Sequence, residues 1–273
     1  MNSALNDALR AARSAPPELL DRLARPARLL VAGAGGALGS AVLEQALATQ
    51  RFADVRVLVT RPLQTSVKGM QTLIVAPFDE PADMASPPAA LADTAVVVFD
   101  LKRHANGRDE AFLRPEPHTL PRLAAWLHGG GVRDLVVVMP HRAASLPQAL
   151  KAGLADLDEH AVVEIGFEHI VFVRSARAPV GDRSKAWLQR LADGVLAQLR
   201  AMTPQPDQPV RSKKVAQFVS ELALQLPHSA PGTRVAAPEL VWQAAQHADA
   251  GALVRAWLAG VALPAPTARR MRL

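Results

Sequence analysis

The sequence contains neither cysteine nor tyrosine, and aromatic residues make up only 4% of its 273 residues. The absence of cysteine excludes disulfide bonds and thiolate chemistry. The absence of tyrosine means that no tyrosine hydroxyl can act as a general acid or base, so any proton transfer must use another group. These two absences narrow the enzyme mechanisms that the chain can support.

Long hydrophobic runs are also missing. No uninterrupted apolar stretch reaches the roughly 18 residues that a membrane-spanning helix needs, although 49% of the residues are hydrophobic. The N-terminal segment lacks a basic region followed by an apolar one, so we expect no secretory signal. The composition therefore predicts a folded protein with a sizeable core and, by elimination, a cytoplasmic one.

The charge balance is positive, with a formal net charge of +6. A surplus of this sign favours anionic ligands. The basic residues do not alternate with aromatic side chains in a stripe, so nucleic acid is not the expected partner. The basic residues Arg269, Arg270 and Arg272 are expected to form a short solvated end.

The stretch from Arg28 to Leu47 is the most informative part of the sequence. A short apolar run, Leu29 to Ala32, precedes four closely spaced glycines, and apolar residues at helical spacing follow them. The hydrophobic period therefore changes from strand-like to helix-like across the glycines. This order is typical of the first strand, turn and helix of a dinucleotide-binding βαβ unit.

The glycines of this turn have distinct expected tasks. Gly33 lets the chain turn tightly out of the strand, and Gly39 lets the helix pack close to the sheet. Gly35 or Gly36 lets the backbone approach a pyrophosphate, which the N–H groups at the helix N-terminus attract. The candidate cofactor-binding residues are Gly33, Gly35, Gly36, Ala37, Leu38 and Gly39. The alternative is a tight strand-to-helix turn that binds no ligand.

The ends of the next two expected strands carry further candidates. A strand over 55–60 ends at Arg61, where an arginine suits the 2′-phosphate of NADP and an acidic residue would favour NAD. We therefore expect NADP rather than NAD, with an ordinary surface arginine as the alternative. A strand over 72–76 precedes Asp79, which either accepts a hydrogen bond from the adenine amino group or caps the next turn.

Strands and helices alternate along the rest of the chain. Several strands are apolar along their whole length, which is typical of a buried parallel sheet. The pattern predicts an α/β fold, a doubly wound parallel sheet (Rossmann fold), with a small C-terminal helical lobe on the substrate side. Further strands are expected over 94–99, 134–139 and 169–174, and helices over 119–127, 146–164, 184–201, 212–226 and 238–258.

The expected domain organisation is simple. Residues 1–27 form an N-terminal helical extension, 28–262 a single NAD(P)-binding domain with C-terminal helices, and 263–273 a tail. The polar segment 100–110 follows the fourth expected strand, at the end of the sheet where ligands bind. Its Lys102, Arg103 and His104 are candidate ligand contacts, with a solvated loop as the alternative.

Four motifs resemble the extended and atypical short-chain dehydrogenase/reductase superfamily. Residues 33–39 are similar to its glycine-rich phosphate loop, and 55–61 to its second strand with an NADP-type arginine. Residues 171–182 resemble its substrate-side loop, and 210–216 resemble its late valine-rich segment. The resemblance covers roughly 28–226 and includes NmrA-like cofactor sensors, relatives of the Tat-interacting oxidoreductase, and flavin-reducing relatives of biliverdin reductase B. It implies an NADP(H) cofactor.

The chain departs from this superfamily where catalysis would occur. Family enzymes use a Tyr-x-x-x-Lys pair, but this chain has no tyrosine, and Pro147 stands four positions before Lys151. His141 and Lys151 are the candidate replacement proton donors for reduction of a carbonyl. A flavin or quinone acceptor can instead take its proton from water.

The loss of the catalytic pair beside a retained glycine loop favours another role. We expect a cofactor-dependent sensor or an assembly or regulatory protein with a protein partner. The alternative is an NADPH-dependent reductase of a small-molecule acceptor, and no metal site is expected.

Overall fold

A computed structural model describes residues 26–63, 67–78, 86–100, 108–139, 159–174 and 212–264. Within these ranges seven strands form one sheet in the order β3-β2-β1-β4-β5-β6-β7, and every neighbouring pair is parallel. The first six strands have the order of a Rossmann sheet. The strands are β1 (Arg28–Ala32), β2 (Asp54–Val59), β3 (Met70–Ile74), β4 (Thr94–Val98), β5 (Asp134–Met139), β6 (His169–Arg174) and β7 (Gly232–Ala236).

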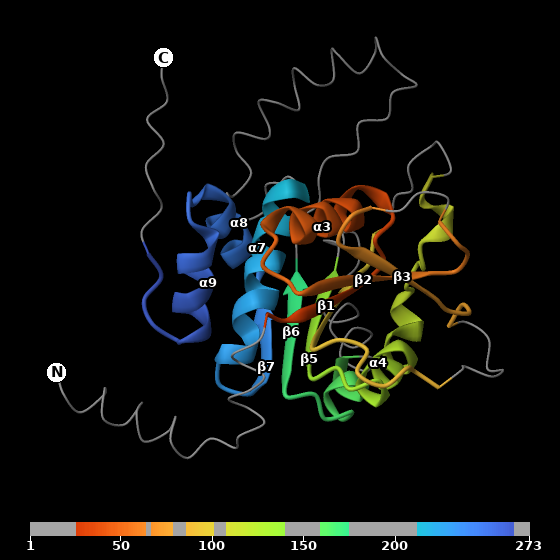
Figure 1. Cartoon of the computed structure of the whole chain (residues 1–273). Coiled ribbons are helices and arrows are strands. Elements are labelled where there is room, and N and C mark those ends of the chain that lie inside the picture. Colours follow the sequence, from red (N-terminus) through yellow and green to blue (C-terminus); the bar gives the residue numbers. More distant parts are fainter. Residues whose placement is uncertain are drawn as a thin grey trace, which may run out of the picture.

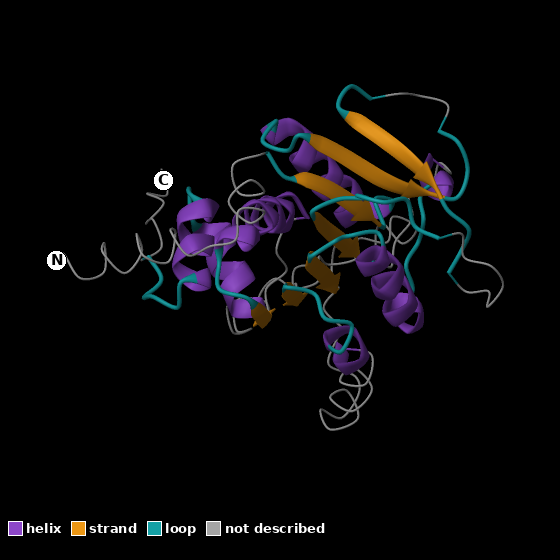
Figure 2. Cartoon of the chain, turned by 60° about the horizontal axis from the view of Figure 1, so that its bottom comes forward, coloured by secondary structure: helices purple, strands orange, loops and turns teal. Residues whose placement is uncertain are grey.

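Helices cover both faces of this sheet (Figures 1 and 2). On one face lie α3 (Gly36–Thr49) and α7 (Ser212–Gln225), which pack against each other. On the other face lies α4 (Leu120–Gly129). The C-terminal helices α8 (Pro238–Gln246) and α9 (Ala250–Leu258) pack against α7, on the side of the first face. The short 3-10 helices are η1 (Arg108–Ala111), η2 (Pro117–Thr119) and η4 (Leu226–His228). The doubly wound α/β prediction is therefore confirmed.

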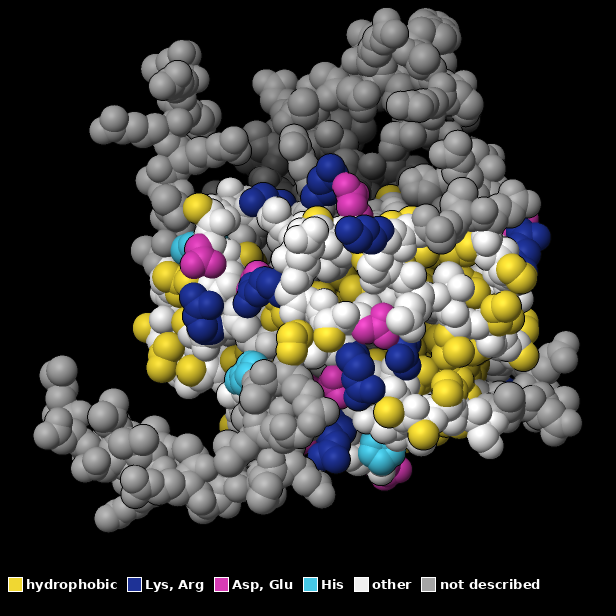
Figure 3. All heavy atoms as spheres, viewed as in Figure 1, with side chains coloured by type: hydrophobic (Ala, Val, Ile, Leu, Met, Phe, Trp, Pro, Cys, Tyr) yellow, Lys and Arg dark blue, Asp and Glu magenta, His cyan; other side chains and the backbone are white. Residues whose placement is uncertain are grey.

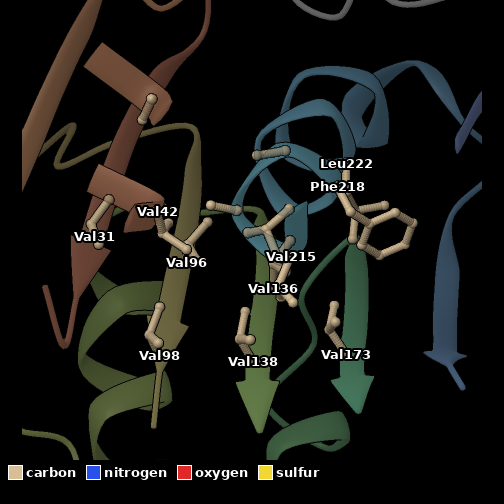
Figure 4. Close-up of a cluster of buried hydrophobic side chains, with 14 of the residues drawn as sticks. Val31, Val42, Val96, Val98, Val136, Val138, Val173, Val215, Phe218 and Leu222 are labelled. Carbon is tan, nitrogen blue, oxygen red and sulfur yellow. The ribbon is translucent and has the colours of Figure 1, made fainter. Parts of the chain in front are cut away.

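The larger core lies between the sheet and α7. Alternate strand residues point to this face because successive side chains of a strand lie on opposite sides of the sheet. Figure 4 shows Val136, Val138 and Val173 from the strands below Val215 and Phe218 from α7. Residues of α8 and α9 belong to the same hydrophobic cluster, so the C-terminal helices share one core with the sheet.

The second core lies under α4. Strand residues of the opposite parity, such as Val97 and Phe172, pack there against Leu123 and Leu127 of the helix. The central strands β4 and β5 are therefore buried on both faces, which explains their continuous apolar sequences.

Several element boundaries follow the sequence pattern and others differ from it. The strands over 134–139 and 169–174 have the expected bounds, and the expected strand over 72–76 lies two residues earlier, at 70–74. The single helix expected over 238–258 is wrong, because Asp249 begins a new helix by accepting a hydrogen bond from the backbone of Ala252. Strand β7 was not expected. Residues 146–158 and 184–201 lie outside the described residues.

The surface carries mixed charge on the face shown in Figure 3, where basic side chains lie next to acidic ones. In the described ranges, no helix is both long enough and apolar enough to cross a bilayer.

Candidate functional site

The glycine turn lies at the point where the strand order reverses. Strand β1 has β2 on one side and β4 on the other, and ligands of open α/β sheets bind outside the carboxyl ends of the strands at such a point. Gly33 has a φ of +85°, and a Cβ there would lie 2.1 Å from the backbone oxygen of Val98 at the end of β4. Only glycine fits this turn, because both the backbone conformation and the available space exclude a side chain.

Helix α3 begins directly after this turn. A Cβ at Gly39 would lie 1.9 Å from the backbone oxygen of Gly33, so the first helical turn packs on the glycine turn itself and not only on the sheet. Gly36 also has a positive φ, of +77°. The N-cap residue Gly35 has no side chain to cap the helix, and the first turn contains no acidic residue. The cap residue and the first turn of α3 therefore provide no acidic side chain at this helix end.

Asp100 supplies an acceptor at this helix end. The backbone N–H of Leu38, in the first turn of α3, donates a 2.7 Å hydrogen bond to Oδ2 of Asp100. Asp100 lies two residues beyond the end of β4, the strand beside β1. A carboxylate at a helix N-terminus is stabilised by the helix dipole and by the charge-assisted hydrogen bond.

Arg61 lies two residues beyond β2 and has an acidic partner. Its guanidinium donates to Oε2 of Glu110, and both side chains are exposed, at 55% and 52%. The arginine expected to meet a 2′-phosphate is therefore paired with a carboxylate of its own chain. An ion pair this exposed is worth about 1 kcal/mol or less.

The segment that leads from Glu110 to α4 runs along the carboxyl end of β2. The backbone N–H of Thr60 donates to the oxygen of Ala111 at 2.8 Å, and that of Leu113 donates to the oxygen of Leu58 at 3.0 Å. Val59 and Phe112 form an antiparallel bridge. This segment lies beside β2 where β1 has ended, because the last paired residues of β1 and β2 are Val31 and Val57.

Some of the predicted site residues lie outside the described residues. They are Asp79, His141 and Lys151, and the candidate ligand contacts Lys102, Arg103 and His104. The structure brings the glycine residues, Ala37 and Leu38 together at the turn and places Arg61 beyond the neighbouring strand. Their roles in binding remain predictions.

A second polar cluster lies at the amino end of the sheet. Nδ1 of His169 is 2.6 Å from Oδ1 of Asp134, and its Nε2 is 3.1 Å from the backbone oxygen of Ser229. Both partners are acceptors when the carboxylate is ionised, so both ring nitrogens must carry protons. Burial of the ring disfavours its charge, but the hydrogen bond to Asp134, the charge of that residue, the Ser229 carbonyl and the charge of Glu168 together raise the pKa of His169 above its usual 6.5.

This cluster does not fit a metal ion. Asp134, Glu168 and His169 lie close enough together to be considered as ligands. A metal-binding histidine must offer a ring nitrogen without a proton, whereas both nitrogens of His169 face acceptors. The cluster stabilises the amino ends of β5 and β6.

Sequence reasoning missed the contacts of Asp100 and Glu110. Each joins residues far apart in the chain, 62 positions for Leu38 with Asp100 and 49 for Arg61 with Glu110. One signal was available, because the fourth strand lies beside the first in a Rossmann sheet and an acidic residue just after it must lie near the glycine turn.

Comparisons with known proteins give a likeness of fold. A comparison with protein families and a comparison with curated sequences each found no match. Among solved structures, a triphenylmethane reductase from Citrobacter complexed with NADP(H) is 12% identical, with 76% of this chain and 69% of that chain covered and a TM-score of 0.46. An Escherichia coli NADPH-dependent quinone oxidoreductase, complexed with NADPH, is 15% identical over 76% of this chain and 68% of that chain, with a TM-score of 0.46.

A third similar structure is a short-chain dehydrogenase/reductase superfamily protein from Agrobacterium tumefaciens with bound NAD. It is 17% identical, covers 86% of this chain and 83% of that chain, and has a TM-score of 0.44. At these values the likeness concerns the Rossmann architecture that the strand order already establishes.

Proposed function

We propose that this chain binds NADP(H) at the glycine turn and acts as a cofactor-dependent sensor or as an assembly or regulatory protein. The observation that carries the proposal is the close packing of Gly33 and Gly39, which brings the N-terminus of α3 to the reversal point of the strand order. The N–H groups at the start of a helix at this point of the sheet suit the phosphates of a dinucleotide.

The chemistry of the predicted site residues supports the assignment of a dinucleotide. The backbone N–H groups at the start of α3 suit a pyrophosphate, and Arg61 suits a 2′-phosphate. A nicotinamide cofactor would supply hydride chemistry when bound. The sequence contains no tyrosine to supply the proton that family enzymes transfer, which favours a binding role over a catalytic one.

Calorimetric titration of the whole chain with NADPH, NADP, NADH and NAD tests the cofactor assignment. We expect the phosphorylated pair to bind more tightly, and Arg61→Glu to weaken NADPH binding about tenfold or more while leaving NADH unchanged, because a charge-assisted contact is worth about 1.5–3 kcal/mol. Arg255→Glu is the matched control, since it reverses the same charge on the exposed surface of α9.

Two results would overturn the proposal. If none of the four nucleotides binds, the glycine turn is a structural feature and the search should move to protein partners. If NADPH binds and is consumed when flavins, quinones or carbonyl compounds are added, the reductase alternative replaces the sensor role.

A further inference from the structure

Asp100 accepts a hydrogen bond at the helix end where we expect the cofactor's pyrophosphate. Phosphate oxygens at a helix N-terminus accept hydrogen bonds from N–H groups of the first turn. One such group, the N–H of Leu38, already donates to Oδ2 of Asp100 at 2.7 Å. A pyrophosphate that needs this donor must displace the carboxylate or lie beside a like charge, and both reduce its affinity.

Glu110 competes in the same way with the cofactor's 2′-phosphate. Its carboxylate accepts from the guanidinium of Arg61, the group expected to recognise that phosphate. A phosphate can make the same contact only by displacing or sharing the guanidinium. Because the pair is exposed, this competition is weaker than the competition at Leu38.

Asp100 and Glu110 both belong to the connection between β4 and α4. Backbone pairing with β2 holds the second half of this connection in place. The bridge between Val59 and Phe112 holds residues next to Glu110 against β2. The same segment continues to Pro115, whose Cδ would lie 3.1 Å from a Cβ built at Gly33. Residues 110–115 therefore pass from the end of β2 to the glycine turn.

We propose that Asp100 and Glu110 are intramolecular competitors of the cofactor's phosphates, Asp100 at the pyrophosphate position and Glu110 at the 2′-phosphate position. The proposal rests on the proposed function, since it describes regulation of the same site. It follows that cofactor binding releases two contacts of the β4–α4 connection. The cofactor concentration would thereby determine whether the contacts of Asp100 and Glu110 are formed.

Two conservative variants separate the two contacts. Asp100→Asn keeps an oxygen that can accept from Leu38 but removes the negative charge, and we expect it to tighten binding of all four nucleotides about tenfold. Glu110→Gln is expected to tighten binding of NADPH and NADP about two- to fivefold and to leave NADH and NAD unchanged, because the exposed pair is weak.

Matched controls remove the same charges elsewhere. Asp54→Asn acts at the amino end of β2, where Asp54 accepts a 2.8 Å hydrogen bond from Arg56. Glu164→Gln acts on an exposed side chain shortly before β6. Calorimetric titrations of the four variants and of the unchanged chain, with thermal melts to verify folding, complete the set.

The outcomes distinguish this inference from the proposed function. Tightening by Asp100→Asn for every nucleotide, with tightening by Glu110→Gln confined to the phosphorylated pair, supports the inference. If the unchanged chain binds NADPH and neither variant binds more tightly, the inference is wrong and the proposed function stands. Equal tightening by the control variants assigns the effect to net charge and also overturns the inference. If no protein binds any nucleotide, both proposals fail.

Discussion

Single residues at the glycine turn determine whether the first helix can pack. A Cβ at Gly39 would approach the backbone oxygen of Gly33 to 1.9 Å. Backbone atoms cannot move away as the tip of a flexible side chain does, so the local structure must shift to admit even a methyl group.

We therefore expect Gly39→Ala to lower the free energy of unfolding by about 1–3 kcal/mol, the usual cost of overpacking. Urea denaturation followed by circular dichroism measures this change. Gly129→Ala is the control, because its Cβ would meet Pro87 at 3.5 Å, an ordinary contact. Equal stability of the two variants would show that the turn near Gly33 relaxes without cost.

At the scale of elements, helix α7 stabilises the sheet on the face that it shares with α3. Phe218 is fully buried between the strands and the C-terminal helices (Figure 4). Truncation of a buried phenylalanine removes apolar contacts and leaves a cavity.

Phe218→Ala is expected to destabilise the protein by about 3–5 kcal/mol, as measured by urea denaturation. Lys213→Ala, on an exposed position of the same helix, is expected to change the stability by less than about 0.5 kcal/mol. A small effect of Phe218→Ala would mean that α7 contributes little to the common core.

The elements show which features a sequence can reveal. Strands β5 and β6 were predicted with their observed bounds because burial on both faces demands continuous apolar residues. Strand β7 was missed because it is an edge strand of mostly exposed residues, held by backbone pairing with β6 that leaves no hydrophobic pattern. The division between α8 and α9 depends on the N-cap at Asp249. Apolar residues at helical spacing continue across this position, so the sequence pattern does not reveal the break.

The candidate site divides in the same way. The glycine turn is local, so its spacing could be recognised in the sequence. The contacts of Leu38 with Asp100 and of Arg61 with Glu110 join distant segments, and only the three-dimensional arrangement brings those side chains together.

At the scale of the whole molecule, the buried pair of His169 and Asp134 links separate parts of the fold. The two side chains are 1% and 0% exposed, and the pair joins β5 and β6 to the turn at Ser229. Because the folded state raises the pKa of His169, the native protein binds more protons than the unfolded chain. The resulting stabilisation is fully present below the unfolded value of about 6.5 and is lost as the pH rises through the folded pKa.

Denaturation at a series of pH values between about 6 and 9 should therefore show stability falling toward high pH. Asp134→Asn should cost about 3–5 kcal/mol at the acidic end, where it leaves a buried charge without its partner, and should flatten this slope. The control His160→Gln removes an exposed histidine and should change the stability by less than about 0.5 kcal/mol. Parallel pH curves for Asp134→Asn and the unchanged chain would contradict this account.

The packing of α3 on α7 has a consequence for synthesis on the ribosome. One side of α3 is covered by α7, a helix that begins roughly 160 residues after α3 ends. At translation rates of about 5–20 residues per second, α7 is synthesised about 8–30 s after α3. The nascent chain therefore exposes a hydrophobic surface over most of its elongation, and chaperones that bind such surfaces should associate with it until α7 has left the exit tunnel.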